Sequence, residues 1–245
     1  MSERLKLPAI CLEIKETPGI LKIGCDLDGV VADIMPAVRD MILERFNIDV
    51  YEIANGKDST EYWLHEWPEI RAITGGSEFV LNMWHNPGLY LAAKQIPRAV
   101  SSINEWRKLG HQIWFITARD KVVAEATLTW LEENELGWAV KENRVLFPQS
   151  SEEDRLSFKS SLARELGLHV LIEDYANVFE HLNSSPSLMV KILLTHPYNV
   201  GKDAGSQVLR VSSWSEIVAV IQEASRWHYH IFSMSHNVDI SINSV

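Results

Sequence analysis

The sequence predicts an α/β fold, with a parallel sheet covered by helices on both faces and a small helical unit inserted after the first strand. Short apolar runs alternate with segments whose apolar residues recur at helical spacing, which is typical of such sheets. The interval between the first run and the next clear one greatly exceeds the dozen or so residues that a crossover requires. The expected strands are residues 20–25, 112–116, 144–147, 169–172, 189–194 and 208–211.

The first expected strand leads into the inserted unit. A helix is expected from Ile34 to Phe46, because its apolar residues fall on one face. An aromatic-rich middle follows, and a second helix from Ala99 to Leu109 leads back to the sheet. The expected division is an N-terminal extension at 1–19, a core at 20–33 and 106–225, an inserted unit at 34–105, and a C-terminal tail at 226–245.

The later core elements continue the alternation. A helix is expected after the second strand, because Val123, Thr127, Trp130 and Leu131 share one helical face. Another helical stretch is expected from Lys159 to Leu166, ending at Gly167. After the last strand, Ser213 and Glu216 have the spacing of a capping box and predict the start of a helix.

The tail is harder to interpret from its residues. Its histidines have neither cysteines nor a carboxylate pair nearby, so we do not expect a zinc site there. Val238, Ile240 and Ile242 alternate with polar residues, which suggests an edge strand or a subunit contact. In the second case the protein would be a homo-oligomer.

Bulk composition excludes several classes of protein. The formal net charge is −10 and there is no basic stripe, which argues against a protein that grips a nucleic-acid polymer. No apolar run approaches the ~20 residues of a membrane span, and the first residues lack the apolar segment of a secretory signal. We therefore expect no membrane partner and a cytoplasmic location. Cys11 and Cys25 are the only cysteines, and a structural disulfide is not expected.

Two carboxylates follow the first strand directly. Asp26 and Asp28 are two positions apart on extended chain, so both can face one pocket, and Gly29 permits a turn. At ~6 Å and an effective dielectric constant of ~20, two such charges repel by about 3 kcal/mol. A cation nearby is therefore expected. The residues that follow do not have the spacing of a calcium-binding loop.

Polar residues also end two later strands. Thr117, Ala118 and Arg119 follow the second strand, and Glu173 and Asp174 follow the fourth. Ligands of open α/β sheets bind beyond the carboxyl ends of the strands, so we expect these groups to form one site. Each motif alone has an ordinary structural alternative, such as a hydroxyl bonded to backbone or an acidic pair at a helix start.

The ordered series Asp26-Leu27-Asp28-Gly29, Thr117, Lys159 and Glu173-Asp174 resembles that of the haloacid dehalogenase-like phosphohydrolases. This resemblance implies that Asp26 is a nucleophile and Asp28 a general acid and base. It implies phosphate binding by Thr117, backbone amides and Lys159. It further implies Mg²⁺ held by the Asp26 carboxylate, the backbone carbonyl of Asp28, and Asp174, and a helical cap over the substrate, here residues 34–105.

The segments Asp26-Leu27-Asp28-Gly29-Val30-Val31-Ala32-Asp33, Trp84-His85-Asn86-Pro87-Gly88-Leu89-Tyr90 and Ile116-Thr117-Ala118-Arg119 look like those of the 5'-nucleotidase type C group, which includes the 5'(3')-deoxyribonucleotidases. The resemblance implies a small phosphorylated substrate, a nucleoside monophosphate.

The substrate contacts expected beyond the core motifs are fewer. Arg119 would add a charged contact or pair with Asp120 or Glu125, and Asp33 would orient Arg119 or the substrate. Cap aromatic residues such as Trp84 would flank a base, or would pack the cap. Glu173 departs from the aspartate usual in the group. The alternatives are a phosphatase for a sugar phosphate, a phosphomutase, and a catalytically silent nucleotide-binding protein.

Overall fold

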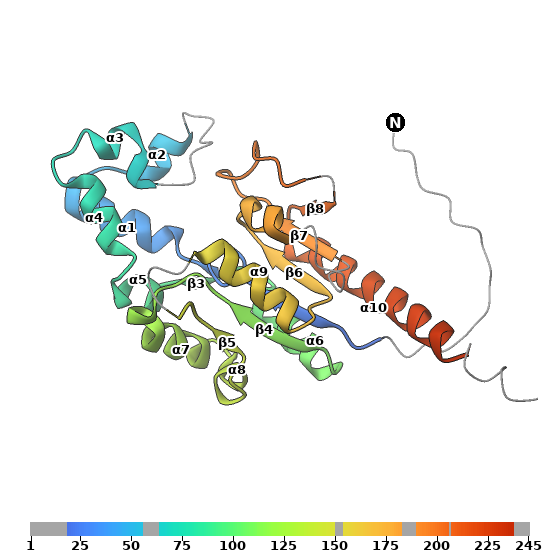
Figure 1. The fold of residues 1–245 in the computed structure, drawn as a ribbon. Helices are drawn as coiled ribbons and strands as arrows, with labels where there is room; N and C mark the ends of the chain where they lie inside the picture. Colours follow the sequence, from blue (N-terminus) through green and yellow to red (C-terminus); the bar gives the residue numbers. More distant parts are fainter. Residues whose placement is uncertain (1–18, 56–63, 150–153, 183–189, 206, 238–245) are drawn as a thin grey trace, which may run out of the picture.

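The structure, a computed structural model, describes residues 19–55, 64–149, 154–182, 190–205 and 207–237 (Figure 1). Its core is a six-stranded parallel sheet in the order β5-β4-β1-β6-β7-β8. The predicted α/β fold is therefore confirmed. The strands are β1 Lys22–Cys25, β4 Gln112–Ile116, β5 Val145–Leu146, β6 Val170–Glu173, β7 Val190–Leu194 and β8 Val208–Val211.

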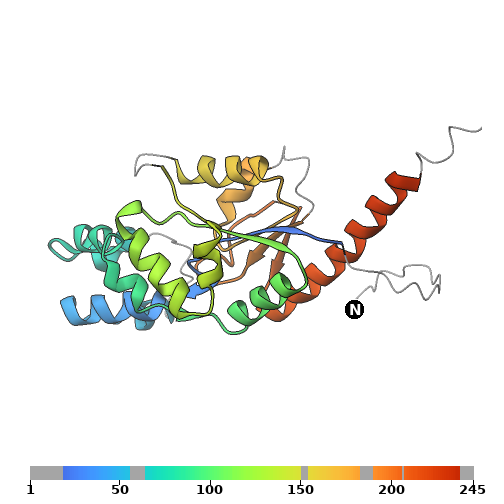
Figure 2. The same cartoon turned by 90° about the horizontal axis from the view of Figure 1, so that it is seen from below.

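Side chains that alternate along the strands build two separate apolar layers. On one face, Ile23, Phe115 and Ile172 belong to a cluster that also holds residues of α6 and α10. On the other face, Ile116 and Leu171 pack with residues of α9 and η3. Figure 2 shows α9 on one side of the sheet and α6 and α10 on the other. This period-two alternation between two covered faces is why the strands read as continuous apolar runs.

The helices of the core lie between these strands in sequence, except the last, which follows β8. They are α6 Ala99–Lys108, η2 Lys121–Val123, α7 Ala124–Glu133, α8 Gly137–Lys141, α9 Arg155–Glu165, η3 Ala176–Leu182 and α10 Trp214–Asn237. The predicted capping box at the start of α10 is present in part. The Ser213 hydroxyl accepts a hydrogen bond from the Glu216 N–H at 3.4 Å, while the Glu216 carboxylate accepts from the Ser212 N–H at 2.9 Å.

The inserted residues form helices that lie beyond one end of the sheet, on the side where β1 ends (Figures 1 and 2). Two short strands, β2 Ala32–Asp33 and β3 Lys94–Gln95, pair antiparallel where the chain leaves and returns. The last helix of the predicted range 34–105, α6, packs against β4 and α10. The helices between β2 and β3 are α1 Met35–Phe46, α2 Val50–Asn55, η1 Leu64–Glu66, α3 Pro68–Arg71, α4 Gly76–Met83 and α5 Pro87–Leu91.

Two element boundaries differ from those predicted by more than two residues. Helix α9 begins at Arg155 rather than Lys159, because the Asp154 carboxylate caps it by accepting from the N–H groups of Leu156 and Ser157 at 3.2 and 3.3 Å. Helix α10 continues through the predicted boundary at 225 as far as Asn237. The strand expected around 238–242 lies outside the described residues.

None of the helices in the described part of the chain is both long enough and apolar enough to span a membrane.

Candidate active site

Two neighbouring strands, β1 and β6, bring the predicted acidic residues together. Asp26 follows β1 and Asp174 follows β6, while Glu173 is the last residue of β6. One carboxylate oxygen from each of these residues lies within 4.8 Å of the others, and all three residues are buried. Two carboxylates at that separation repel by about 3 kcal/mol at an effective dielectric constant of ~20. The cluster therefore needs positive charge beside it.

Lys159 supplies one positive charge from α9. Its Nζ lies 2.8 Å from Asp26 Oδ2 and 2.6 Å from Glu173 Oε1, and its side chain is 4% exposed. Burial alone would lower the pKa of this ammonium, but the charges of Asp26 and Glu173 raise it above the ordinary value. When all three carboxyl groups are ionised, Lys159 offsets one of their three negative charges. The two charges that remain then equal the charge of one divalent cation.

Two oxygens of the cluster differ from the others in their hydrogen bonding. Glu173 Oε2 and Asp174 Oδ1 are buried and accept no hydrogen bond from any described residue. Burial, and next the charge of Asp26, raise the pKa of Asp174 to about 7. Buried, unpaired carboxylate oxygens are the ligands that a hard cation such as Mg²⁺ prefers. The residues present therefore fit a divalent cation, and Glu173 adds a carboxylate to the predicted set.

Asp28 lies outside this cluster and is held by Arg119. The guanidinium Nη2 is 2.6 Å from Asp28 Oδ1, and Nε donates to Oδ2 at 3.0 Å. Nη1 donates to the Thr127 hydroxyl of α7 at 3.1 Å, and the Tyr90 ring of α5 lies 4.3 Å from the guanidinium carbon. The Arg119 side chain is 1% exposed. This arrangement joins the inserted helices, α7 and the turn after β1.

The alternative partners expected for Arg119 have other roles. The Asp120 carboxylate accepts from the Val122 N–H at 3.0 Å and caps η2. The Asp33 carboxylate accepts from the Met35 N–H at 3.2 Å, at the start of α1. Among the described residues, the carboxylate that pairs with Arg119 is Asp28, so the alternative of a pair with Asp120 or Glu125 is wrong, and the alternative of a charged contact with substrate stays a prediction.

The other predicted residues occupy the same end of the sheet or its rim. Thr117 is fully buried, and its hydroxyl accepts from the Arg119 N–H at 3.2 Å. Ala118 is partly exposed beside it. Trp84 is also partly exposed, and its carbonyl accepts from the Tyr90 hydroxyl at 2.8 Å. Trp67 is buried and packs the insertion, whereas Tyr62 and Trp63 lie outside the described residues.

The turn after β1 requires glycine at position 29 for two reasons. Gly29 has a φ of 72°, which side chains other than glycine rarely adopt. A Cβ there would lie 2.2 Å from Asp174 Oδ2 and 2.6 Å from the Tyr198 hydroxyl. The turn can therefore approach Asp174 closely only because this residue has no side chain.

Sequence reasoning missed the loop after β7. The Tyr198 hydroxyl donates to Asp174 Oδ2, and Asn199 Nδ2 donates to the Asp174 carbonyl at 2.8 Å. His196 Nε2 lies 2.6 Å from the Gly29 carbonyl oxygen. Ligands of open α/β sheets bind beyond the carboxyl ends of the strands. Because this loop follows β7 of the same parallel sheet, that rule could have indicated it as part of the site.

Cys25 is not a candidate nucleophile. It is fully buried with a free thiol, and burial, with the charges of Asp26 and Glu173, raises the pKa of that thiol. Cys11 lies outside the described residues.

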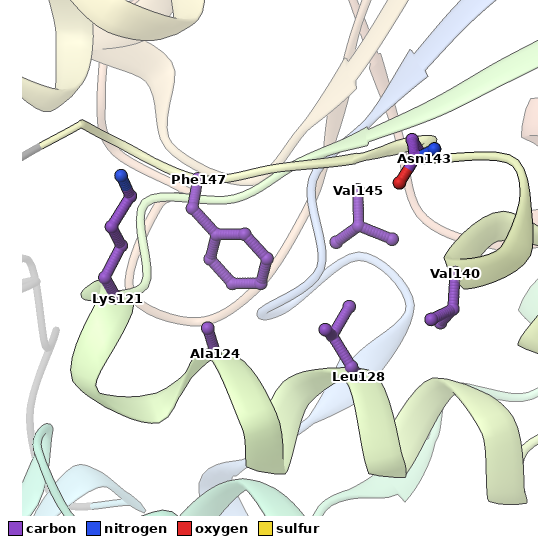
Figure 3. A pocket seen from close by; sticks show the side chains of 7 residues that line it. All are labelled: Lys121, Ala124, Leu128, Val140, Asn143, Val145 and Phe147. Carbon is purple, nitrogen blue, oxygen red and sulfur yellow. The ribbon is translucent and has the colours of Figure 1, made fainter.

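An apolar cavity of about 420 Å³ lies apart from the acids, between α7, α8 and β5 (Figure 3). Leu128, Val145 and Phe147 line it, with Lys121 at one end. None of the acidic cluster lines this cavity, so it is separate from the candidate active site.

Comparison with solved structures places this arrangement in a known fold. A haloacid dehalogenase family hydrolase of Deinococcus radiodurans, with bound phosphate and sodium, has a TM-score of 0.55 and 17% identity over 85% of this chain and 97% of that chain. A "predicted phosphatase" of Clostridium acetobutylicum has a TM-score of 0.58 and 13% identity over 84% and 100%. The chain has the haloacid dehalogenase-like fold. The predicted resemblance is thus confirmed for the fold.

Sequence comparisons add more similar proteins. A Bacillus cereus protein named "Putative nucleotidase" is 27% identical over 208 residues, which are 83% of this chain and 99% of that protein. A nucleotidase of Clostridium acetobutylicum is 23% identical over 202 residues, or 82% and 93%. The family model of the PITM 1-3 LNS2 domain matches residues 85–178 of this chain.

Proposed function

We propose that the chain is a phosphomonoester hydrolase that uses a divalent cation, Mg²⁺, and acts on nucleoside monophosphates. The observation that carries the proposal is the buried cluster of three carboxyl groups after β1 and β6, two of which contact Lys159. Such a cluster is costly to fold unless it binds a cation. The haloacid dehalogenase-like fold and the relatives named nucleotidases support the reaction class.

The cation would be held by the carboxylates of Asp26 and Asp174 and the backbone carbonyl of Asp28, with Glu173 beside them. When bound, it would neutralise phosphate charge and orient the transferring phosphoryl group. The unpaired Asp174 Oδ1 and Glu173 Oε2 support this assignment, because both are buried acceptors without a donor among the described residues.

Asp26 would act as the nucleophile. One of its oxygens attacks phosphorus, the bond between phosphorus and the leaving oxygen breaks, and Asp26 carries the phosphoryl group until water releases it as phosphate. Lys159, 2.8 Å from Asp26 Oδ2, holds that carboxylate in one orientation and would also bind a phosphate oxygen. The Thr117 hydroxyl, buried at the end of β4, would bind another after a small rearrangement.

Asp28 would give a proton to the leaving oxygen and then take one from the attacking water. Arg119 holds the Asp28 carboxylate in place by donating hydrogen bonds to both of its oxygens. Because Arg119 already donates to Asp28 and Thr127, we assign it the positioning of Asp28 in addition to any contact with substrate.

Selection of a nucleoside would fall to the inserted helices. Trp84 is a partly exposed aromatic residue whose carbonyl binds Tyr90, and the Tyr90 ring packs on Arg119. These contacts connect the Trp84 backbone to Arg119 through Tyr90, and they support a role for the Trp84 side chain beside the substrate. Asp33, at the start of α1, would lie on the same side. The cytoplasmic location and a homo-oligomeric state remain predictions from the sequence.

The test is phosphate release from a panel of nucleoside 5'- and 3'-monophosphates and sugar phosphates, with Mg²⁺ and with chelator. We expect Mg²⁺-dependent release with nucleoside monophosphates preferred. Preference for sugar phosphates would reject the substrate assignment and keep the reaction. Release of phosphate from no compound would reject the enzyme and favour a silent nucleotide-binding protein.

A further inference from the structure

The loop after β7 is built as a rigid support. Asn199 is 2% exposed, and its Nδ2 donates to the carbonyls of Asp174 and Leu194, both at 2.8 Å. Its Oδ1 accepts from the His196 N–H at 3.0 Å and from Arg210 Nη1 at 3.2 Å. These bonds tie the loop to the ends of β6, β7 and β8. A buried side-chain amide whose donors and acceptor all form hydrogen bonds fixes a loop in one conformation.

The same loop contacts both strand-end turns of the acidic cluster. His196 Nε2 donates to the Gly29 carbonyl at 2.6 Å, which requires a proton on that nitrogen. The His196 and Tyr198 rings are stacked with centroids 5.1 Å apart and an interplanar angle of 8°. Tyr198 is thereby held with its hydroxyl directed at Asp174 Oδ2.

The two oxygens of Asp174 are consequently in different situations. Oδ2 accepts a hydrogen bond from Tyr198 and lies against the backbone of Gly29, so close that a Cβ on that residue would be only 2.2 Å away. There is little free space around this oxygen. Oδ1 is buried and accepts no hydrogen bond from any residue in the described ranges. A cation in the cluster can therefore reach Oδ1, whereas Oδ2 is occupied by the phenol.

We propose that Tyr198 makes Asp174 a ligand through one oxygen only, and that this selects Mg²⁺ over Ca²⁺. Mg²⁺ demands near-octahedral coordination by single oxygens, whereas Ca²⁺ takes six to eight ligands and often binds a carboxylate through both oxygens. The proposal rests on the cation site of the proposed function and adds a residue that sets its selectivity. Tyr198 is a positioning residue, because it acts through Asp174.

The variant Tyr198→Phe removes the hydroxyl and keeps the ring stacked on His196. Without the phenol, the Asp174 carboxylate can turn and offer both oxygens. Loss of a residue that orients a metal ligand typically weakens metal affinity by about 10–100-fold. We expect that loss for Mg²⁺ and no loss for Ca²⁺, which can bind a carboxylate through both oxygens, so that the preference for Mg²⁺ falls about tenfold or more.

The measurement is the thermal unfolding midpoint of the full chain, titrated separately with MgCl₂ and CaCl₂ after chelator treatment. The rise in midpoint with concentration gives an apparent dissociation constant for each ion. Tyr51→Phe is the matched control, since it removes a phenol from an exposed side chain on α2. A merely structural effect of Tyr198→Phe would lower the midpoint and leave the ratio of the two constants unchanged.

Each result has one interpretation. A fall in the Mg²⁺ to Ca²⁺ preference in Tyr198→Phe, and none in Tyr51→Phe, supports the inference. Equal preferences in wild type and Tyr198→Phe overturn it while leaving the cation site intact. If neither ion shifts the wild-type midpoint, the cation site fails, and the proposed function and the inference fall together.

Discussion

Replacing Asp174 by asparagine should stabilise the metal-free protein, although it removes a proposed metal ligand. The folded chain raises the pKa of this carboxyl to about 7, from about 3.9 in an unfolded chain. Below pH 4 the folded and unfolded states both hold this proton, so the group does not change the free energy of unfolding with pH. As pH rises from 4 to 7 the folded state keeps a proton that the unfolded state has released, so stability falls. Above pH 7 the loss is complete.

The magnitude follows from those two pKa values. The free energy of unfolding should be reduced by about 1–2 kcal/mol at pH 5 and by about 4 kcal/mol at pH 8 relative to pH below 4. Asparagine has the same shape, can still accept from Tyr198, and carries no charge. The variant should therefore be more stable than wild type in chelator, and its advantage should grow between these pH values.

Urea unfolding in chelator at pH 5 and pH 8 measures this difference. Added Mg²⁺ should raise the stability of the wild type and have little effect on Asp174→Asn. An advantage of the variant that is equal at the two pH values would refute the reasoning. So would a variant that is less stable than wild type at pH 8.

Three further substitutions test other parts of the site. Gly29→Ala should abolish stabilisation by Mg²⁺ in a thermal titration, because the new Cβ would meet the metal ligand Asp174. The control is Gly75→Ala, where φ is a similar 76° but no atom lies within 4 Å of the new Cβ. This control should lower the free energy of unfolding by about 1 kcal/mol and keep the Mg²⁺ response. Lys159→Met should lower the free energy of unfolding by about 3–5 kcal/mol at pH 8, because it leaves the buried carboxylates of Asp26 and Glu173 without a positive partner. The loss should be smaller at pH 5. An equal loss at both pH values would contradict the role of Lys159 as the partner of these carboxylates. Arg119→Lys should slow hydrolysis of a nucleoside monophosphate about tenfold or more. The reason is that the general acid Asp28 would be misplaced, and general acid catalysis contributes ~10²–10⁴-fold to the rate. Hydrolysis of p-nitrophenyl phosphate, whose leaving group needs no proton, should change less, and equal losses for the two substrates would contradict the role of Arg119 in placing Asp28.

The parts of the site that follow from strand ends could be predicted from sequence. Apolar runs that end in Asp26, Thr117 and Asp174 fix where those residues emerge, because parallel strands share one carboxyl edge. Lys159 was assigned from motif order, and α9 brings it to Asp26 and Glu173. Its helix was predicted to begin four residues late. Only two of the four residues in the first turn of α9, Leu156 and Phe158, are apolar, so the cap at Asp154 marks its start more clearly than the apolar spacing does.

Side-chain pairing could not be predicted in the same way. Several acids were within sequence reach of Arg119, and only the turn after β1 decides that Asp28 is its partner. Tyr198 carries no charge and belongs to no acidic motif, so its bond to Asp174 depends on how the loop after β7 folds over β6. Periodicity locates elements, whereas such contacts depend on the conformation of loops between them.

The central claim is that Asp26 accepts the phosphoryl group and that Asp28 is needed to release it. The most direct measurement uses Asp28→Asn with Mg²⁺ and p-nitrophenyl phosphate, mixed rapidly, followed by acid quenching and mass analysis of the peptides. The account predicts a burst of nitrophenol close to one equivalent per chain, and a phosphoryl group on the peptide at Asp26. A phosphoryl group on another residue, or steady turnover at the wild-type rate without a burst, would contradict it.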